Sequence, residues 1–170
     1  MITEFLDKLK TLDIPTCLRV CAGTDGSITF LLEIMTKMEV SVITQEQYLI
    51  PANKDTASLF DTNIGDDINY RVVKLVAGNK PYIYARSLSP IKRMPLEVKQ
   101  DMMRADIPIG KILRNHDIET RRDFENLEII NNYEFFDCNQ VLSRSYKIIH
   151  HNHVLMWINE LFPVDERWYL

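Results

Sequence analysis

Two charged residues lie in otherwise apolar, strand-like stretches of this 170-residue chain, and they are the first candidates for chemistry. Arg86 is in Pro81-Tyr-Ile-Tyr-Ala-Arg-Ser-Leu-Ser-Pro90, where alternation places it on one face with two tyrosines and a leucine. That face resembles an interior face, and a buried guanidinium needs hydrogen-bonding partners. Arg86 is therefore either half of a structural ion pair or a cation that binds an anionic ligand.

The second candidate is Glu160, in the stretch from Val154 to Phe162. With a period of two, its neighbours on the same face are all apolar. A carboxylate in such surroundings would be desolvated, which would raise its pKa and let it donate or accept a proton. Two alternatives stay open: Glu160 pairs with Arg86, or the opposite face, which is also apolar, is the buried one.

Two helix starts could supply further contacts to the same anion. Hydrophobic spacing predicts a helix that begins near Ser27, and Pro108 suits the first turn of another helix. The first turn of a helix has free backbone amides and a partial positive charge, here around Ile28 and Ile109. If Arg86 and these amides converge, they form a small carboxylate-binding pocket with aliphatic walls.

Other possible sites carry weaker signals. The cysteines are three in number, and Cys17-x-x-x-Cys21 lacks a second metal-ligand pair, so ordinary reduced thiols are expected. The histidines in His150–His153 fall at an expected hairpin turn without a carboxylate at ligand spacing, so no metal site is predicted. The basic pairs Lys92-Arg93 and Arg121-Arg122 are interpreted as solvated surface.

Composition limits the class of protein. The net charge is −4 with acidic and basic residues interleaved, which is not the pattern of a nucleic-acid-binding protein. The chain shows neither an apolar run of transmembrane length nor a signal-peptide pattern, so no membrane partner and a cytoplasmic location are expected. We expect one domain over residues 1–170.

The helices and strands expected along the chain must position these groups. Together they indicate an α+β fold, with helices packed on a mostly antiparallel sheet of about six strands. A polar stretch without periodicity, Asn53 to Asp67, is predicted to be a loop and is a candidate lid. Helices are expected at Thr3–Leu12, from Ser27, at Leu96–Arg104 and from Ile107, and strands at Glu39–Ile50, Ile68–Ala77, Pro81–Pro90, the second part of His116–Ile130, Val141–His150 and Val154–Phe162.

Four motifs in this order resemble the chorismate lyase (chorismate pyruvate-lyase) family, particularly its archaeal-type branch. Bacterial members have Gly-Ser-Met-Thr in the first motif and Pro-Leu-Gly in the third, whereas this chain has Ile28 and Ile109 at the two variable positions. Because those family positions contribute mainly backbone amides, the changes matter little. The four motifs are Asp25-Gly-Ser-Ile-Thr29, Tyr84-Ala-Arg-Ser-Leu-Ser-Pro90, Pro108-Ile-Gly-Lys-Ile-Leu113 and Leu155-Met-Trp-Ile-Asn-Glu-Leu-Phe-Pro163.

The resemblance implies a cofactor-free lyase that converts chorismate to 4-hydroxybenzoate and pyruvate. By similarity, Arg86 and the amides of Ile28 and Ile109 would hold the ring carboxylate, and Glu160 would face the C4 oxygen. The alternative is a non-catalytic effector-binding domain of the UTRA type found in GntR-type regulators, whose fold resembles the lyase. Against that alternative, no helix-turn-helix pattern precedes the domain. A related reaction that gives another hydroxybenzoate is a third possibility.

Overall fold

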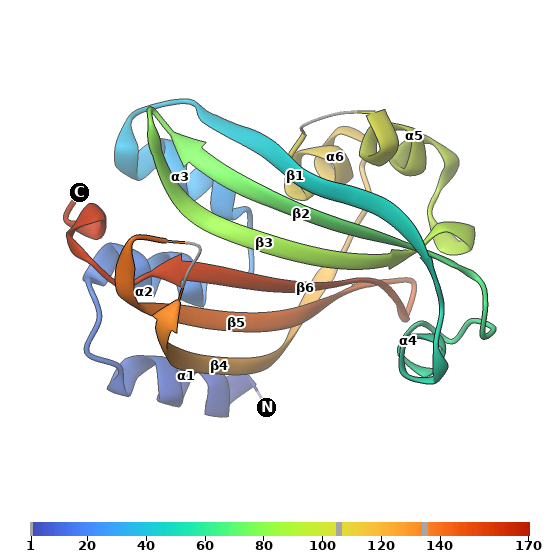
Figure 1. The fold of residues 1–170 in the computed structure, drawn as a ribbon, viewed down its shortest axis with the longest axis horizontal. Coiled ribbons are helices and arrows are strands. Elements are labelled where there is room, and N and C mark those ends of the chain that lie inside the picture. The colour runs from blue at the N-terminus through green and yellow to red at the C-terminus, as the bar shows by residue number, and fades with distance from the viewer. Residues whose placement is uncertain (1, 105–106, 134–135) are drawn as a thin grey trace.

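An antiparallel sheet of six strands forms the body of the computed structural model, which describes residues 2–104, 107–133 and 136–170 (Figure 1). The strand order is β1-β2-β3-β6-β5-β4, and every neighbouring pair is antiparallel. The predicted α+β class with a six-stranded sheet is therefore confirmed. The strands are β1 (Val40–Pro51), β2 (Asp67–Ala77), β3 (Lys80–Pro90), β4 (Arg121–Tyr133), β5 (Cys138–His150) and β6 (His153–Pro163).

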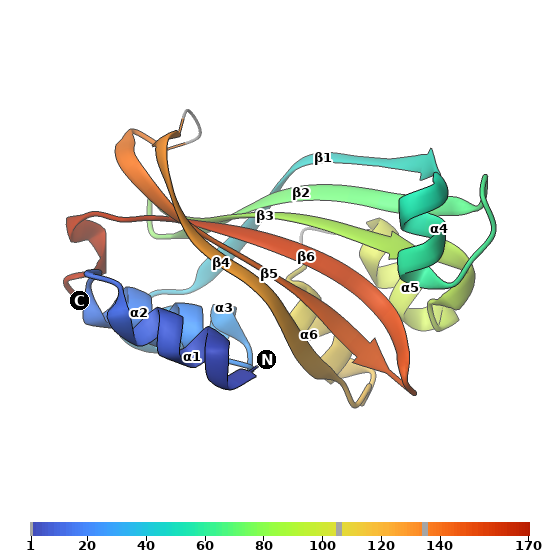
Figure 2. The same cartoon turned by 90° about the horizontal axis from the view of Figure 1, so that it is seen from below.

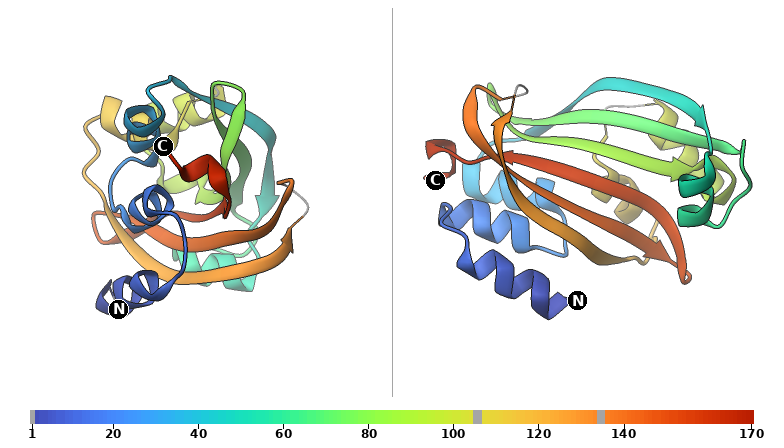
Figure 3. Two further views of the ribbon diagram at one scale, coloured as in Figure 1. Left: turned by 90° about the vertical axis from the view of Figure 1, so that its left-hand side faces the viewer. Right: turned by 60° about the horizontal axis from the view of Figure 1, so that its bottom comes forward.

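The sheet is strongly curved, and most helices lie on its concave side (Figures 2 and 3). Helices α1, α2, α3 and α6 fill this side, whereas α4 packs against the opposite, convex face. None of the helices formed by the described residues has the length and apolar character needed to cross a bilayer. The helices are α1 (Ile2–Thr11), α2 (Thr16–Gly23), α3 (Ile28–Thr36), α4 (Lys54–Phe60), α5 (Leu96–Arg104) and α6 (Ile109–Asn115), with short 3₁₀ turns η1 (Ile91–Arg93) and η2 (Glu166–Trp168).

The main core lies between the concave face and the helices. Phe5 of α1 stacks on Phe124 of β4 with ring centroids 4.3 Å apart, which attaches the first helix to the edge of the sheet. In α3, Ile28, Leu32 and Thr36 are buried at a spacing of four, as expected for one face of a helix. This spacing directs the helix start toward the sheet.

The last hairpin turns where the histidine-rich segment predicts it. His151 and Asn152 connect β5 to β6, and both have positive φ, 48° and 65°. A two-residue hairpin turn with positive φ at both central positions matches the twist of the strands. The register then shifts by one residue at an irregularity between Ile148 and Ile149, and beyond it Arg144 of β5 lies opposite Glu160 of β6.

The prediction for Asn53 to Asp67 is wrong in part, because the first half of this stretch is helix α4. Asn53 caps the helix by accepting hydrogen bonds from the amides of Asp55 and Thr56. Ala57 and Phe60 are buried in a second cluster on the convex face, together with residues of β3 and β6. The segment is thus held by its own apolar contacts on the side of the sheet away from α3 and α6.

Candidate functional site

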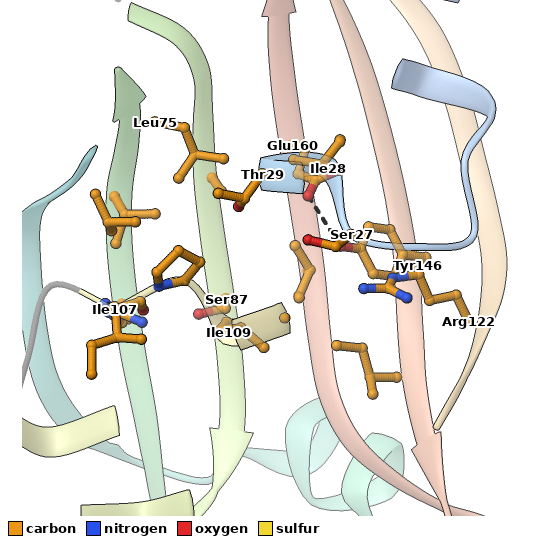
Figure 4. Close-up of a pocket in the computed structure, with 18 of the residues that line it drawn as sticks. Ser27, Ile28, Thr29, Leu75, Ser87, Ile107, Ile109, Arg122, Tyr146 and Glu160 are labelled. Carbon is orange, nitrogen blue, oxygen red and sulfur yellow. Dashed lines mark hydrogen bonds between the residues drawn. The ribbon is translucent and has the colours of Figure 1, made fainter. Parts of the chain in front are cut away.

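A pocket lies between the concave face and the first turns of α3 and α6 (Figure 4). About 610 Å³ of the space among its lining residues is free of atoms, and this figure includes space that is open to solvent. All six strands contribute to its lining. The lining residues are Val42, Arg71, Val73, Leu75, Ala85, Ser87, Ile158, Glu160, Tyr146, Ile148 and Arg122 of the strands, with Gly26–Thr29 and Ile107–Gly110 above them.

Strand register explains why these side chains meet. Arg71 pairs with Ser87, Ser87 with Ile158, and Ile158 with Tyr146, so the four residues form one row across β2, β3, β6 and β5. Directly paired residues point to the same face of a sheet. The row therefore forms the floor of the pocket, and Glu160 adds a carboxylate two residues further along β6.

The first turns of α3 and α6 form the roof. Ser27 is the N-cap of α3, as predicted, and its side chain accepts a hydrogen bond from the amide of Phe30 at 3.3 Å. Pro108 is the N-cap of α6, one residue earlier than its predicted first-turn position. A Cβ atom on Gly110 would lie 3.4 Å from Ser27 Oγ, so the two helix starts are in close contact. The structure thus brings Ile28 and Ile109 to the same pocket.

Glu160 is buried in the pocket wall, as its apolar neighbours predict, and it is paired. Its Oε2 lies 2.6 Å from Arg144 Nε. Its Oε1 accepts a hydrogen bond from the Tyr146 hydroxyl at 3.0 Å (Figure 4). Burial first, and then the charge of Glu160, raises the pKa of Tyr146 well above its usual value. The phenol therefore stays protonated and remains a donor to the carboxylate.

Arg144 holds Glu160 against the end of α2. Its side chain is completely buried, and Nη1 donates to the carbonyls of Cys21, Ala22 and Thr24. A cation is favourable at the C-terminal end of a helix, where carbonyl groups lack intrahelical partners. The ion pair that the sequence suggested for Glu160 thus exists, but its partner is Arg144 and not Arg86.

Arg86 is the main error of the sequence interpretation. It lies on the convex face, is exposed to solvent, and stacks over Trp157 with its Cζ 5.5 Å from the ring centroid. On β3 the pocket is lined by Ala85 and Ser87, which have the opposite parity. The convex face of β3 also carries apolar side chains because α4 covers part of it, and this made the wrong face look like interior.

The buried cation at the pocket is Arg71 of β2, which the sequence interpretation missed. Only 1% of the residue is exposed, and its Nη2 donates to the carbonyl of Ile107 at 3.2 Å. Arg71 follows Tyr70 and precedes two valines, so both faces of its strand are rich in apolar groups and periodicity gives no clear signal. A charged residue inside such a strand was the available clue.

The interpretation of Arg121-Arg122 as solvated surface is wrong for its second member. Arg121 is exposed and pairs with Asp123, whereas Arg122 is half-buried and lines the pocket. Because alternate residues of β4 point to opposite faces, neighbouring arginines have different environments.

The candidate lid is also not at this site, since none of residues 53–67 lines the pocket.

The cysteines and histidines offer no second reactive centre in the described structure. Burial raises the pKa of the Cys21 thiol to about 12, so it is not a thiolate at neutral pH. Cys17 and Cys138 are also free thiols. Among residues 2–104, 107–133 and 136–170, no group of three or more His, Cys, Asp or Glu side chains has the geometry to hold a metal ion.

Comparison with known proteins agrees with the motif order. Residues 23–170 match the family described as chorismate pyruvate-lyase Rv2949c-like. The chain belongs to this family. The predicted resemblance is therefore confirmed, and a similar protein named "Putative lyase MJ0807", from the archaeon Methanocaldococcus jannaschii, is 35% identical over 157 residues, which cover 86% of this chain and 77% of that protein.

The solved structures that resemble this member of the chorismate pyruvate-lyase family have low sequence identity to it. They are therefore evidence for its fold alone. PhnF from Mycobacterium smegmatis has a TM-score of 0.68 at 11% identity and covers 82% of this chain. The chain matches only 64% of the PhnF chain, which is less than two thirds of its length. A structure described as "the ligand-binding domain of a putative GntR-family transcriptional regulator", from Bordetella bronchiseptica, has a TM-score of 0.60 at 11% identity and covers 75% of this chain and 87% of that chain.

Proposed function

We propose that this protein is a chorismate pyruvate-lyase that converts chorismate to 4-hydroxybenzoate and pyruvate. The observation that carries the proposal is a single pocket in which a buried guanidinium, Arg71, and a buried carboxylate, Glu160, share one concave face. An aromatic acid with a para oxygen needs these two groups at its two ends. Family membership supports the same substrate class.

In the proposed complex, Arg71 and the amides of Ile28 and Ile109 hold the ring carboxylate. Arg71 replaces Arg86 in this role because it is buried and lines the pocket, whereas Arg86 is exposed on the other face of the sheet. Charge-assisted hydrogen bonds to a carboxylate are stronger than neutral ones, and a planar guanidinium can bind both oxygens. The apolar walls contact the ring, and they include Val73, Leu75 and Ile158.

Glu160 would accept a hydrogen bond from the C4 hydroxyl of chorismate. In the reaction, the bond between C3 and the ether oxygen breaks and C4 loses its hydrogen, which makes the ring aromatic. The enolpyruvyl group leaves and gains one hydrogen on its methylene carbon, giving pyruvate. The atoms balance without water, oxidant or reductant, so the chain's contribution is to orient the dianion and shield it from water.

Incubation of the purified protein with chorismate tests the proposal. We expect 4-hydroxybenzoate and pyruvate to form in equal amounts, and faster than in a control without protein. ¹H NMR identifies the aromatic product, so a different hydroxybenzoate would be seen directly. Formation of products only at the uncatalysed rate would refute the proposal.

The second candidate function is non-catalytic effector binding, which the structural similarity to PhnF and to the GntR-family domain favours. Titration calorimetry separates the two candidates. The lyase should bind 4-hydroxybenzoate in preference to sugar phosphates. A protein that binds a sugar phosphate, and has no activity on chorismate, would instead be an effector-binding domain.

A further inference from the structure

We infer that Arg122 binds the enolpyruvyl carboxylate of chorismate and so forms a second anion subsite beside Glu160. This inference rests on the proposed function and extends it. Chorismate carries two carboxylates, and the contacts proposed above account only for the one on the ring. A second carboxylate in a partly apolar pocket requires a cation of its own, because an unpaired buried charge is costly.

Arg122 retains hydrogen-bonding capacity for such a ligand. Its Nη1 donates to the carbonyl of Asp25, and its Cζ lies 5.7 Å from the centroid of the Tyr146 ring. Its Nε is buried without a hydrogen-bond partner, and Arg122 forms no ion pair with any residue that the structure describes. A buried donor of this kind is normally satisfied by protein, water or a ligand.

The position of Arg122 fits the second end of a dianion. Strands β2 and β4, which carry Arg71 and Arg122, each lie two strands from β6, which carries Glu160. Figure 4 shows Ile107 and Arg122 on opposite sides of the pocket, and the carbonyl of Ile107 accepts the hydrogen bond from Arg71. The two guanidinium groups therefore approach the pocket from opposite sides.

Tyr146 links Arg122 to the reacting end of the substrate. The Tyr146 hydroxyl donates to Glu160 Oε1 at 3.0 Å, while its ring contacts the Arg122 guanidinium. With Glu160 at the C4 oxygen, the ring orientation that we propose places the ether on the adjacent C3 on the side of Tyr146. The enolpyruvyl carboxylate is attached to the carbon that follows the ether oxygen, which brings it toward Arg122. The negative charge of Glu160 is already matched by Arg144.

The opening next to Arg122 provides room for this group. Gly26, Ser27, Gly110 and Arg122 line both the pocket and an adjacent surface cavity bounded by the segment Leu113 to Thr120. Arg122 thus lies in the wall between the interior and the surface. A substituent that leaves the ring on this side is directed toward solvent, which suits a group that departs as pyruvate.

A purely structural role is the competing explanation, since the bond to Asp25 connects β4 with the loop before α3. Two stable ligands distinguish the roles. 3-(Carboxymethoxy)benzoate is an ether dianion with a carboxylate placed as in chorismate, and 4-hydroxybenzoate has the ring carboxylate alone. Neither ligand reacts, so binding can be measured by titration calorimetry.

We expect Arg122→Gln to weaken binding of the dianion by about 10- to 100-fold, and binding of 4-hydroxybenzoate by no more than about twofold. Arg122→Lys, which keeps the charge, should recover part of the dianion affinity. Arg121→Gln is the matched control, because Arg121 is exposed on the other face of the same strand, and it should bind both ligands as the wild type does.

Equal weakening for both ligands would assign Arg122 a structural role and overturn the inference. Unchanged affinity for both ligands would overturn it as well. The chorismate turnover assay with wild-type protein tests the proposed function separately. The wild-type protein could fail to turn over chorismate while Arg122→Gln still loses affinity for the dianion alone. That combination would refute the lyase function but support the anion subsite at Arg122.

Discussion

Replacing Arg144 with methionine should strongly destabilise the protein, because Glu160 would become an unpaired buried charge. The exposed fractions of the two side chains are 0% and 7%, and Nε and Oε2 are 2.6 Å apart. Removing one member of a buried pair costs about 3–5 kcal/mol. The free energy of unfolding should therefore fall by about that amount, a large part of the roughly 5–15 kcal/mol typical of a domain.

A double-mutant cycle isolates the ion pair from other effects. Glu160→Gln removes the charge that Arg144 must balance, so the double variant should cost less than the sum of the two single variants, by about 2–3 kcal/mol. Arg19→Met is a matched control, because Arg19 donates to two backbone carbonyls and forms no ion pair among the described residues. It should lose only backbone hydrogen bonds.

Urea unfolding, followed by tryptophan fluorescence at several protein concentrations, measures these free energies. Our expectation is a large decrease in the free energy of unfolding for Arg144→Met, a smaller decrease for Arg19→Met, and clear coupling between Arg144 and Glu160. A cost below about 1 kcal/mol for Arg144→Met would contradict it. Strict additivity in the cycle would also contradict it, because independent sites show no coupling.

Three further predictions concern the pocket and the pH dependence of stability. Arg71→Gln should weaken 4-hydroxybenzoate binding by about 10- to 100-fold in calorimetry, whereas Arg86→Gln should stay within about twofold of wild type; the reverse order would restore Arg86 to the site. Glu160→Gln should bind 4-hydroxybenzoate but lower kcat for chorismate by about 100-fold or more, and a wild-type kcat would remove Glu160 from the mechanism. Hydrogen bonds, first from Lys92, lower the pKa of Asp66 from 3.8 to about 2, so its stabilising effect is present above the unfolded-state pKa and is lost as pH falls through the folded-state pKa. Asp66→Asn should therefore lower Tm at neutral pH, with the difference shrinking between about pH 4 and pH 2; a constant difference would contradict this.

Local patterns in the sequence were sufficient for most elements of the fold. The turn at His151-Asn152 and the start of α3 at Ser27 depend on interactions within a few residues, so both could be predicted. The strands were predicted from β-branched and aromatic residues between prolines and glycines. Helix α4 was missed because its short polar sequence forms a helix only where Ala57 and Phe60 pack on the convex face.

The lining of the pocket was predicted in part. Glu160, Ile28 and Ile109 do line one pocket, because each belongs to a motif whose local structure could be inferred. Arg86 was placed there wrongly, since period two defines two faces of a strand without saying which of them is covered by helices. The cover is decided by distant segments, here α3 and α6 on one side and α4 on the other.

By itself, the sequence determined the family, the α+β class, the helix starts above the pocket and the buried carboxylate at the end of the chain. Only the tertiary structure decided which guanidinium groups face that carboxylate. Register across β2, β3, β6 and β5 aligns Arg71 with Ser87, Ile158 and Tyr146, and antiparallel pairing places Arg144 beside Glu160. The physical reason is that alternation along a strand is a local property, whereas the choice of interior face and of partners depends on packing between segments distant in the chain.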